Sequence, residues 1–344
     1  MINYSQVAFN IINNFLKIYK DMVISISGEI HNAQGSVQPL VEIPLIEELA
    51  IAIRKRKAFP VLELSTQNLK KRFFQEMPDE ILEIPPHYYD SWIDAIDVFI
   101  EINWKNLTDE FDEKIKEKYD KFKSHTNPIW EKIFNQKKKV IFLNFPTLEL
   151  AKHIDINYED LKQQYFNAIN CNYNLLRTRR EELQDDIFSF ASYRISMGSE
   201  ELDLKLEKDK PAAFIGSDQI VILPSGFVEF PAHRNSLNGV FKADKAYYDG
   251  YIYDNINLNL ENGVVRFVAF EAEKKGNYKL QNALMNSGKD CSLSLGFNKN
   301  ISSYTNYFYY DRCREGTITL SFLATGGKRI ALLNSKAILK KNKG

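Results

Sequence analysis

The first half of the chain alternates between amphipathic segments and short apolar runs. Apolar side chains spaced three to four residues apart over residues 4–20 predict an amphipathic helix, and the apolar run at 22–28 predicts a buried strand. A second helix is predicted at 43–57, with Pro44 near its first turn, and a second short strand at 59–65. Because strand, helix and strand follow one another, the pattern predicts a parallel sheet of the α/β type.

The same alternation continues toward the middle of the chain. The predicted elements are a segment at 69–82 that is helical up to Pro78, a strand at 94–102, a charged helix at 108–134, a strand at 137–146 and a long helix at 157–187. Asn157 lies at the start of the last helix and is a favourable N-cap residue. We therefore predict an α/β domain over residues 1–190.

Beyond residue 191 the pattern changes to short strands separated by Gly, Asn and Asp. Asn262-Gly263 lies between two such strands and predicts a hairpin with a type I′ turn, because both residues readily adopt positive φ. One helix is predicted at 276–288. The predicted strands are 193–198, 212–216, 219–226, 227–231, 239–244, 251–263, 264–274, 292–297, 306–311 and 317–323. We predict a mostly antiparallel β (α+β) domain over residues 191–344.

Composition and charge narrow the class of protein. The 344 residues include 45 basic and 45 acidic side chains, and this zero net charge argues against general nucleic-acid binding. A hydrophobic fraction of 44% is enough to fill packed cores. No apolar run reaches the roughly 18 residues of a membrane span, and the start of the chain has no cleavage-site pattern, so we expect no membrane span and a cytoplasmic protein. Three cysteines without metal-type spacing are expected to be ordinary thiols.

Histidine is scarce and unevenly distributed. The five are His31, His87, His125, His153 and His233, so a metal site in the last third of the chain would have no imidazole beyond residue 233. The metal-ligand spacings H-x-x-x-H and C-x-x-C do not occur, and neither do the phosphate-binding glycine loops or the G-x-S-x-G nucleophile turn. We therefore expect no cofactor.

Three stretches of the second half carry motifs in a fixed order. They are ILPSGFVEFPAHRNSLNGVF (222–241), LSLGFNKNI (293–301) and YYDRCREGTITLSF (309–322). They resemble N-x-P-x-G-E-v-x-x-a-P, G-x-G-x-N-x-x-I and x-D-E-K-x-x-G-T-x-H-x-A of the M29 family of metallo-aminopeptidases, whose shorter members include ring-opening dioxygenases for dihydroxypyridines. Segments 147–176 and 195–211 are similar to the same family. The resemblance implies an M29 aminopeptidase-like fold over roughly the whole chain.

The departures from these motifs concern the metal ligands. The two ligand Glu positions fall on Phe227 and near Ser292, and the ligand His falls on Thr319. The family's final H-x-D pair falls near residues 329–335, which contain neither residue type. The framework positions that remain are Pro224, Gly226, Pro231, Gly239, Gly296, Asn298, Asp311, Gly316 and Thr317. The resemblance thus implies a scaffold that kept its groove after the catalytic centre was lost.

Our first hypothesis is a non-catalytic protein that binds a peptide in this groove by strand addition. The expected client is a precursor peptide of ribosomal peptide natural-product (RiPP) biosynthesis, held for a modifying enzyme. The candidate groove residues are Phe227, Glu229, His233, Arg234, Asn298, Asp311, Thr317 and Thr319.

Two alternatives stay open. Glu229 shares a strand face with Phe227 and, together with His233 and Asp311, would form a shifted single-metal site in a divergent metallo-aminopeptidase or a mononuclear-iron dioxygenase. The other alternative is a structural subunit that pairs with an active relative, because the M29 resemblance implies dimers, either homodimers or heterodimers.

Overall fold

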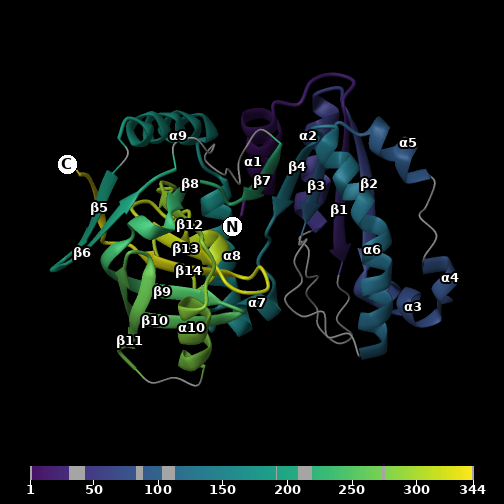
Figure 1. Cartoon of the computed structure of the whole chain (residues 1–344). Coiled ribbons are helices and arrows are strands. Elements are labelled where there is room, and N and C mark those ends of the chain that lie inside the picture. The colour runs from purple at the N-terminus through teal and green to yellow at the C-terminus, as the bar shows by residue number, and fades with distance from the viewer. Residues whose placement is uncertain are drawn as a thin grey trace. The chain divides into compact units, whose positions relative to one another are not determined.

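The computed structural model describes residues 2–30, 43–82, 88–102, 113–190, 192–207, 219–272 and 276–342. The chain divides into two compact units (Figure 1). The first unit comprises Met1–Tyr173 with Gly216–Pro224, and the second comprises Asn174–Ile215 with Ser225–Gly344. A search of the described helices finds none with the length and hydropathy needed to cross a membrane.

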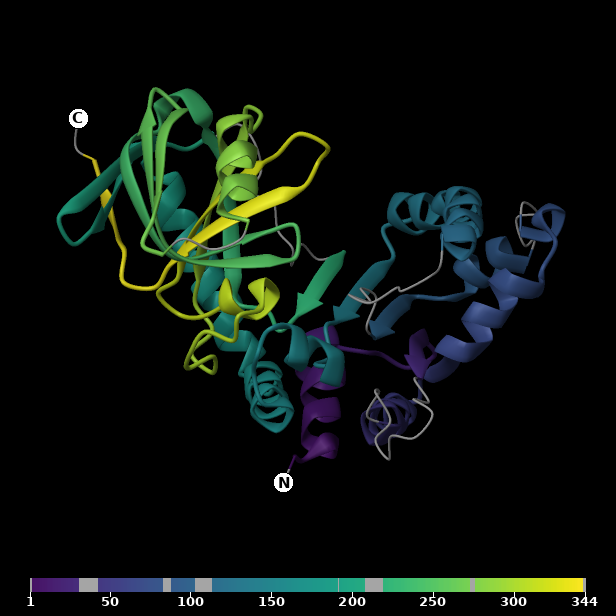
Figure 2. The same cartoon turned by 90° about the horizontal axis from the view of Figure 1, so that it is seen from below.

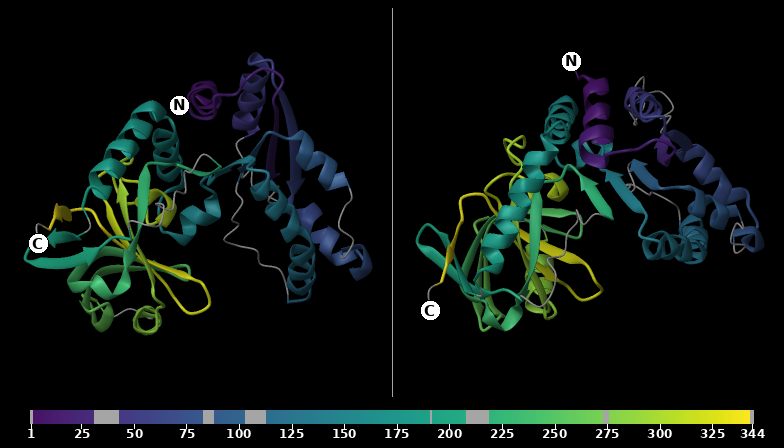
Figure 3. Two further views of the ribbon diagram at one scale, coloured as in Figure 1. Left: turned by 45° about the horizontal axis from the view of Figure 1, so that its top comes forward. Right: turned by 90° about the horizontal axis from the view of Figure 1, so that it is seen from above.

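A parallel sheet of five strands forms the centre of the first unit. Its order is β2-β1-β3-β4-β7, and every neighbouring pair is parallel. The strands are β1 (Val23–Ile30), β2 (Phe59–Thr66), β3 (Val98–Ile102), β4 (Lys139–Leu143) and β7 (Ile220–Leu223). Figures 2 and 3 show α2 (Ile43–Lys55) on one face of the sheet and α6 (Glu113–Asn135) on the other. The α/β prediction for this part of the chain is confirmed.

The other helices of the first unit are short. They are α1 (Tyr4–Phe9), the π-helix η1 (Asn10–Leu16), α3 (Gln67–Glu76), α4 (Asp79–Leu82), α5 (Tyr88–Ala95), α7 (Leu148–His153) and α8 (Tyr158–Ile169). Asn157 caps α8 as predicted, since its side chain accepts hydrogen bonds from two amides of the first turn. The single helix predicted at 157–187 is wrong, because Asn170 ends α8 with a non-helical ψ of 45° and α9 (Tyr173–Phe188) follows as a separate helix.

One predicted strand belongs to a different sheet. The sequence places residues 219–226 in the antiparallel domain, whereas β7 pairs in parallel with β4 and Ile220 lies opposite Val140. Its residues Ile-Val-Ile-Leu form a continuous apolar run. Such runs are typical of parallel strands covered on both faces, whereas antiparallel strands with one solvated face alternate.

An antiparallel sheet of ten strands forms the second unit. Its main order is β15-β5-β6-β9-β14-β13-β12-β8, and β10 pairs with β9 and β11. The strands are β5 (Ser192–Met197), β6 (Glu200–Lys205), β8 (Phe227–His233), β9 (Asn238–Tyr248), β10 (Tyr251–Glu261), β11 (Val264–Phe270), β12 (Asp290–Gly296), β13 (Ile318–Leu323), β14 (Arg329–Asn334) and β15 (Ile338–Lys341). Asn262 and Gly263 have φ of 49° and 76° between β10 and β11, which confirms the predicted hairpin.

Besides α9, which lies almost entirely in the second unit, the described residues of this unit form three short helices. They are the 3-10 helix η2 (Arg234–Ser236), α10 (Asn277–Met285) and α11 (Phe308–Asp311). The strand predicted at 306–311 is therefore wrong: aromatic residues favour strands in general, but here they form one helical turn at the end of a loop. The strand predicted at 212–216 lies outside the described residues.

Strands β8, β12 and β13 have one apolar face and one mostly polar face, and β14 adds Arg329 to the mostly polar side. Side chains alternate between the faces of a strand, and directly opposed residues of neighbouring strands share a face. Phe230, Leu293 and Leu320 are opposed in this way and lie in the core of the second unit. We call the other side the polar face. It includes Phe227, Glu229, Pro231, Ser292, Ser294, Thr319, Ser321 and Arg329, together with the apolar residues Leu323, Ala331 and Leu333.

Candidate functional site

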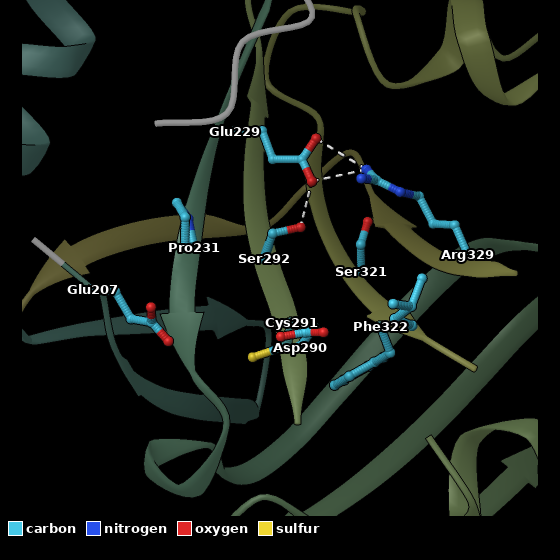
Figure 4. A pocket seen from close by; sticks show the side chains of 10 residues that line it. Glu207, Glu229, Pro231, Asp290, Cys291, Ser292, Ser321, Phe322 and Arg329 are labelled. Atoms are coloured by element: carbon cyan, nitrogen blue, oxygen red, sulfur yellow. Dashed lines mark hydrogen bonds and ion pairs between the residues drawn. The ribbon is translucent and has the colours of Figure 1, made fainter. Parts of the chain in front are cut away.

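Glu229 lies on the polar face with only 2% of its surface exposed. Its Oε1 accepts a hydrogen bond from Ser292 Oγ, and Arg329 Nη1 donates to both carboxylate oxygens, at 2.8 and 2.9 Å (Figure 4). The Arg329 side chain is 41% exposed, so the ion pair joins a buried carboxylate to a partly solvated guanidinium. Both oxygens of Glu229 are therefore already engaged by donors of the protein.

A pocket of about 270 Å³ lies beside this ion pair (Figure 4). Its walls include Glu207, Glu229, Asp290, Ser321, Phe322 and Arg329. Sites for whole small molecules usually have volumes of about 300–1,000 Å³. The pocket therefore suits one or two side chains of a larger ligand better than a complete cofactor.

Phe227 and Arg312 form a stack at the end of the polar face. The guanidinium carbon of Arg312 lies 3.9 Å from the ring centre of Phe227, and 4.8 and 5.4 Å from those of Phe308 and Tyr309. Arg312 is 1% exposed. Burial lowers the pKa of Arg312 from its ordinary value, although Glu229 acts in the opposite direction. An arginine remains protonated at neutral pH despite such a shift, so the three rings stabilise a permanent buried cation.

Two framework residues hold the segment that carries this cation. Gly296 approaches the backbone so closely that a Cβ atom would lie 2.2 Å from the carbonyl oxygen of Arg314 and 2.6 Å from that of Arg312. Asn298 Nδ2 donates to the carbonyl of Ser225 at 2.8 Å. Glycine and asparagine at these positions are thus needed to seat the segment on the edge of the sheet.

Both carboxylate oxygens of Asp311 accept hydrogen bonds that stabilise the fold. Its Oδ1 accepts from the backbone N and Oγ1 of Thr305, at 2.6 and 2.7 Å, and its Oδ2 accepts from the hydroxyl of Tyr247. Complete burial raises the pKa of Asp311 to about 6, although the hydrogen bonds from Tyr247 and Thr305 act in the opposite direction. These contacts join the loop before α11 to β9.

His233 and Arg234 lie at the other end of β8. His233 is 57% exposed in its side chain, and its Nδ1 is 3.9 Å from Glu207 Oε1. Arg234 Nε donates to the carbonyl of Gly263 at 2.6 Å, and its guanidinium lies 4.3 Å from the centre of the Phe322 ring. Both residues therefore contact the border of the pocket or the core and not the Phe227–Arg312 stack.

The three candidate ligands of a shifted metal site are not brought together. His233 follows Glu229 by four residues, or about 13 Å along a strand, and Asp311 is bound to Tyr247 and Thr305. Within the described ranges, no group of three or more His, Cys, Asp or Glu side chains could hold a metal ion. Zinc and iron sites take imidazole, carboxylate or thiolate ligands, so the residues present do not fit either metal.

The predicted groove residues Thr317 and Thr319 are fully buried. Thr319 lies opposite Ser294, which in turn lies opposite Glu229, and Thr317 precedes it by two residues. Neither hydroxyl has a hydrogen-bond partner in the part of the chain that the structure describes. Phe227, Glu229 and the two threonines thus belong to one region, whereas the other predicted groove residues serve the framework or the pocket border.

Sequence reasoning missed Arg312 and Arg329. A signal existed for the first: the motif matched by residues 309–322 has an acidic residue directly after its Asp, and this chain has Arg312 there. No local signal existed for Arg329, because its partner Glu229 is 100 positions away.

Comparison with known proteins supports the fold. No protein-family model and no curated protein sequence matches the chain. Among solved structures, wild-type AmpT from Thermus thermophilus matches with a TM-score of 0.63 and 15% identity, over 94% of this chain and 86% of AmpT. The chain has an M29 aminopeptidase-like fold. The 2,5-dihydroxypyridine dioxygenase from Pseudomonas putida KT2440 matches with a TM-score of 0.56 and 10% identity, over 100% of this chain and 95% of the dioxygenase.

Proposed function

We propose that this protein is a non-catalytic, metal-free member of the M29-like fold that binds a peptide on the polar face. The observation that carries the proposal is the chemistry of that face: Arg329 neutralises its carboxylate, Glu229, and Arg312 covers Phe227. A dinuclear metal site needs several carboxylates and imidazoles with free lone pairs. Cations and hydroxyl groups there favour ligand binding over metal-assisted hydrolysis.

An extended peptide has a strand edge available beside the pocket. β8 ends the main order of the sheet, and apart from the isolated bridge between Leu206 and Ala232 no other described strand pairs with its outer edge. Strand addition at such an edge supplies main-chain hydrogen bonds, and pockets for alternate side chains supply selectivity. The edge is already occupied at Pro231 and Ala232, because Glu207 N donates to the Pro231 carbonyl at 2.9 Å and Leu206 bridges Ala232. A peptide would therefore pair with β8 at residues 227–230, beside the Glu229 wall of the pocket.

The client we propose is a precursor peptide of RiPP biosynthesis, presented to a modifying enzyme. A dimer of this chain, or of this chain with a relative, is compatible with that role and stays a prediction. Peptides encoded beside the gene are therefore the first ligands for titration calorimetry.

The decisive experiment combines a metal test with a binding test. We expect purified protein to hold no stoichiometric zinc, iron, cobalt or manganese and to leave leucine p-nitroanilide intact when each metal is added. We expect a neighbouring-gene peptide to bind, and Phe227→Glu to weaken binding at least tenfold, because the new carboxylate would neutralise Arg312. Phe267→Glu is the matched control, since Phe267 is 57% exposed on β11. Tight metal with peptidase activity, or no binding of any neighbouring peptide, would overturn the proposal.

A further inference from the structure

Arg312 is a buried cation that forms no ion pair with a carboxylate of the described residues. Its Nε has no hydrogen-bond partner, and none of the ion pairs formed among the described residues involves it. A buried polar group normally has its hydrogen bonds satisfied, because an unpaired group costs about 1–3 kcal/mol. The three aromatic rings offset part of the desolvation of the charge, but they cannot accept its N–H groups in the guanidinium plane.

Hydroxyl groups on β13 and just before it are also unpaired. The hydroxyls of Thr317, Thr319 and Ser321 are buried and have no hydrogen-bond partner among the described residues. The register places Thr319 in the cross-strand row of Glu229 and Ser321 in the row of Ser292. Figure 4 shows the Ser321 hydroxyl directed toward the Glu229–Arg329 pair. Every one of these groups offers an O–H or N–H donor.

The charge balance of the region is positive. Two guanidinium groups, Arg312 and Arg329, accompany one carboxylate, Glu229, and all three interact electrostatically. Glu207 and Asp290 lie on the pocket wall near the far end of β8, beside Pro231 and Cys291. Arg312 therefore lies at the Phe227 end of the polar face, whereas Arg329 lines the same pocket as Glu207 and Asp290.

We propose that Arg312, together with the hydroxyls of Thr317 and Thr319, binds a carboxylate group of the peptide ligand. This assignment rests on the proposed function and names the chemistry that the site recognises. A carboxylate has only acceptor lone pairs, and the planar guanidinium matches its two oxygens. The carboxylate is that of an Asp or Glu side chain or of a peptide C-terminus.

The test uses the intact protein and a minimal probe. Ligand-detected NMR compares N-acetylglycine with N-acetylglycinamide, which differ only in the carboxylate. We expect saturation transfer to the acid and at least fivefold less to the amide. Equal transfer to both probes, or none to the acid, would overturn the assignment.

Two variants separate binding from folding. Arg312→Gln should weaken binding of the acid at least tenfold, whereas Arg314→Gln, two residues along the same loop, should leave it unchanged. Thr319→Val serves where Arg312→Gln does not fold, because valine has the same shape and removes an unpaired hydroxyl. We expect Thr319→Val to melt at the same temperature or higher and to bind the acid at least threefold more weakly. Unaltered binding in Thr319→Val and in a folded Arg312→Gln variant refutes the assignment.

The outcomes also separate this inference from the proposed function. A neighbouring-gene peptide can be compared with a version whose C-terminus is amidated and whose Asp and Glu residues are replaced by Asn and Gln. Equal binding of the two peptides overturns the carboxylate assignment and leaves peptide binding intact. Binding of N-acetylglycine that depends on Arg312, without binding of any neighbouring-gene peptide, supports the carboxylate site and counts against the peptide client.

Discussion

Replacing Arg329 by methionine should destabilise the second unit by about 3 kcal/mol. Methionine keeps the length of the side chain and removes the guanidinium that donates to both oxygens of Glu229. Loss of one partner of a buried ion pair costs about 3–5 kcal/mol, because the other charge stays buried. We take the lower end because the Arg329 side chain is 41% exposed and solvent screens part of the interaction.

A double-mutant cycle isolates the pair. Glu229→Gln should cost about 1 kcal/mol, because the amide oxygen still accepts from Ser292 while the charge is lost. If the two changes were independent, the double variant would lose about 4 kcal/mol, the sum of the two. We expect it to lose only about 2 kcal/mol, since no unpaired carboxylate remains, which gives a coupling energy of about 2 kcal/mol.

Hydrogen exchange, measured by mass spectrometry along a urea series, gives the unfolding free energy of the second unit separately from that of the first. All three tryptophans, Trp92, Trp104 and Trp130, belong to the first unit, so tryptophan fluorescence reports on the other part of the chain. Peptides that cover β12 and β13 should lose protection in Arg329→Met and regain much of it in the double variant. A coupling energy below about 0.5 kcal/mol would show that Glu229 does not depend on Arg329.

Three further predictions concern the framework and the thiols. Between pH 5 and pH 7, the unfolding free energy of wild type should fall by about 1 kcal/mol relative to that of Asp311→Asn. The reason is that a carboxyl group whose folded pKa is raised from 3.8 to about 6 contributes stability at low pH and loses this contribution as the pH rises through 6. An equal difference between the urea unfolding curves of the two proteins at both pH values would contradict this. Gly296→Ala should cost about 3 kcal/mol in thermal and urea unfolding, because its Cβ would clash with the carbonyl of Arg314, and a wild-type melting temperature would exclude that contact. The three cysteines should react with Ellman's reagent only after unfolding, because all three are buried and burial raises the pKa of Cys171 to about 12; rapid reaction of the native protein would show that a thiol is accessible.

The alternation of polar and apolar residues predicted much of the scaffold. Four strands of the parallel sheet are short apolar runs, and Asn262-Gly263 has the turn chemistry that its hairpin requires. The same reasoning misplaced β7, because a run of four apolar residues does not specify which sheet it joins. Pairing of β7 with β4 depends on a contact about 80 positions distant, and local periodicity carries no information on contacts of that range.

The candidate site was predicted in part. The motif order led to Phe227 and Glu229 on β8 and to the two threonines on or just before β13, and the sheet places β8 and β13 on either side of β12. It also led to His233, which strand geometry separates from Glu229 by about 13 Å. The two arginines were missed because charge pairing across a sheet depends on long flexible side chains, whose direction the residue pattern does not specify.

An arginine differs from a metal ion in what it can do for a bound peptide. A metal ion polarises a carbonyl group and also lowers the pKa of a bound water to near 7, which generates the nucleophile for hydrolysis. A guanidinium donates hydrogen bonds to a carbonyl or carboxylate, but it coordinates no water and does not give up a proton near neutral pH. Arg312 on Phe227 therefore offers the attraction of a cation without a means to cleave the ligand. On our proposal, the same replacement that removes hydrolysis preserves recognition, and a client peptide leaves this site intact.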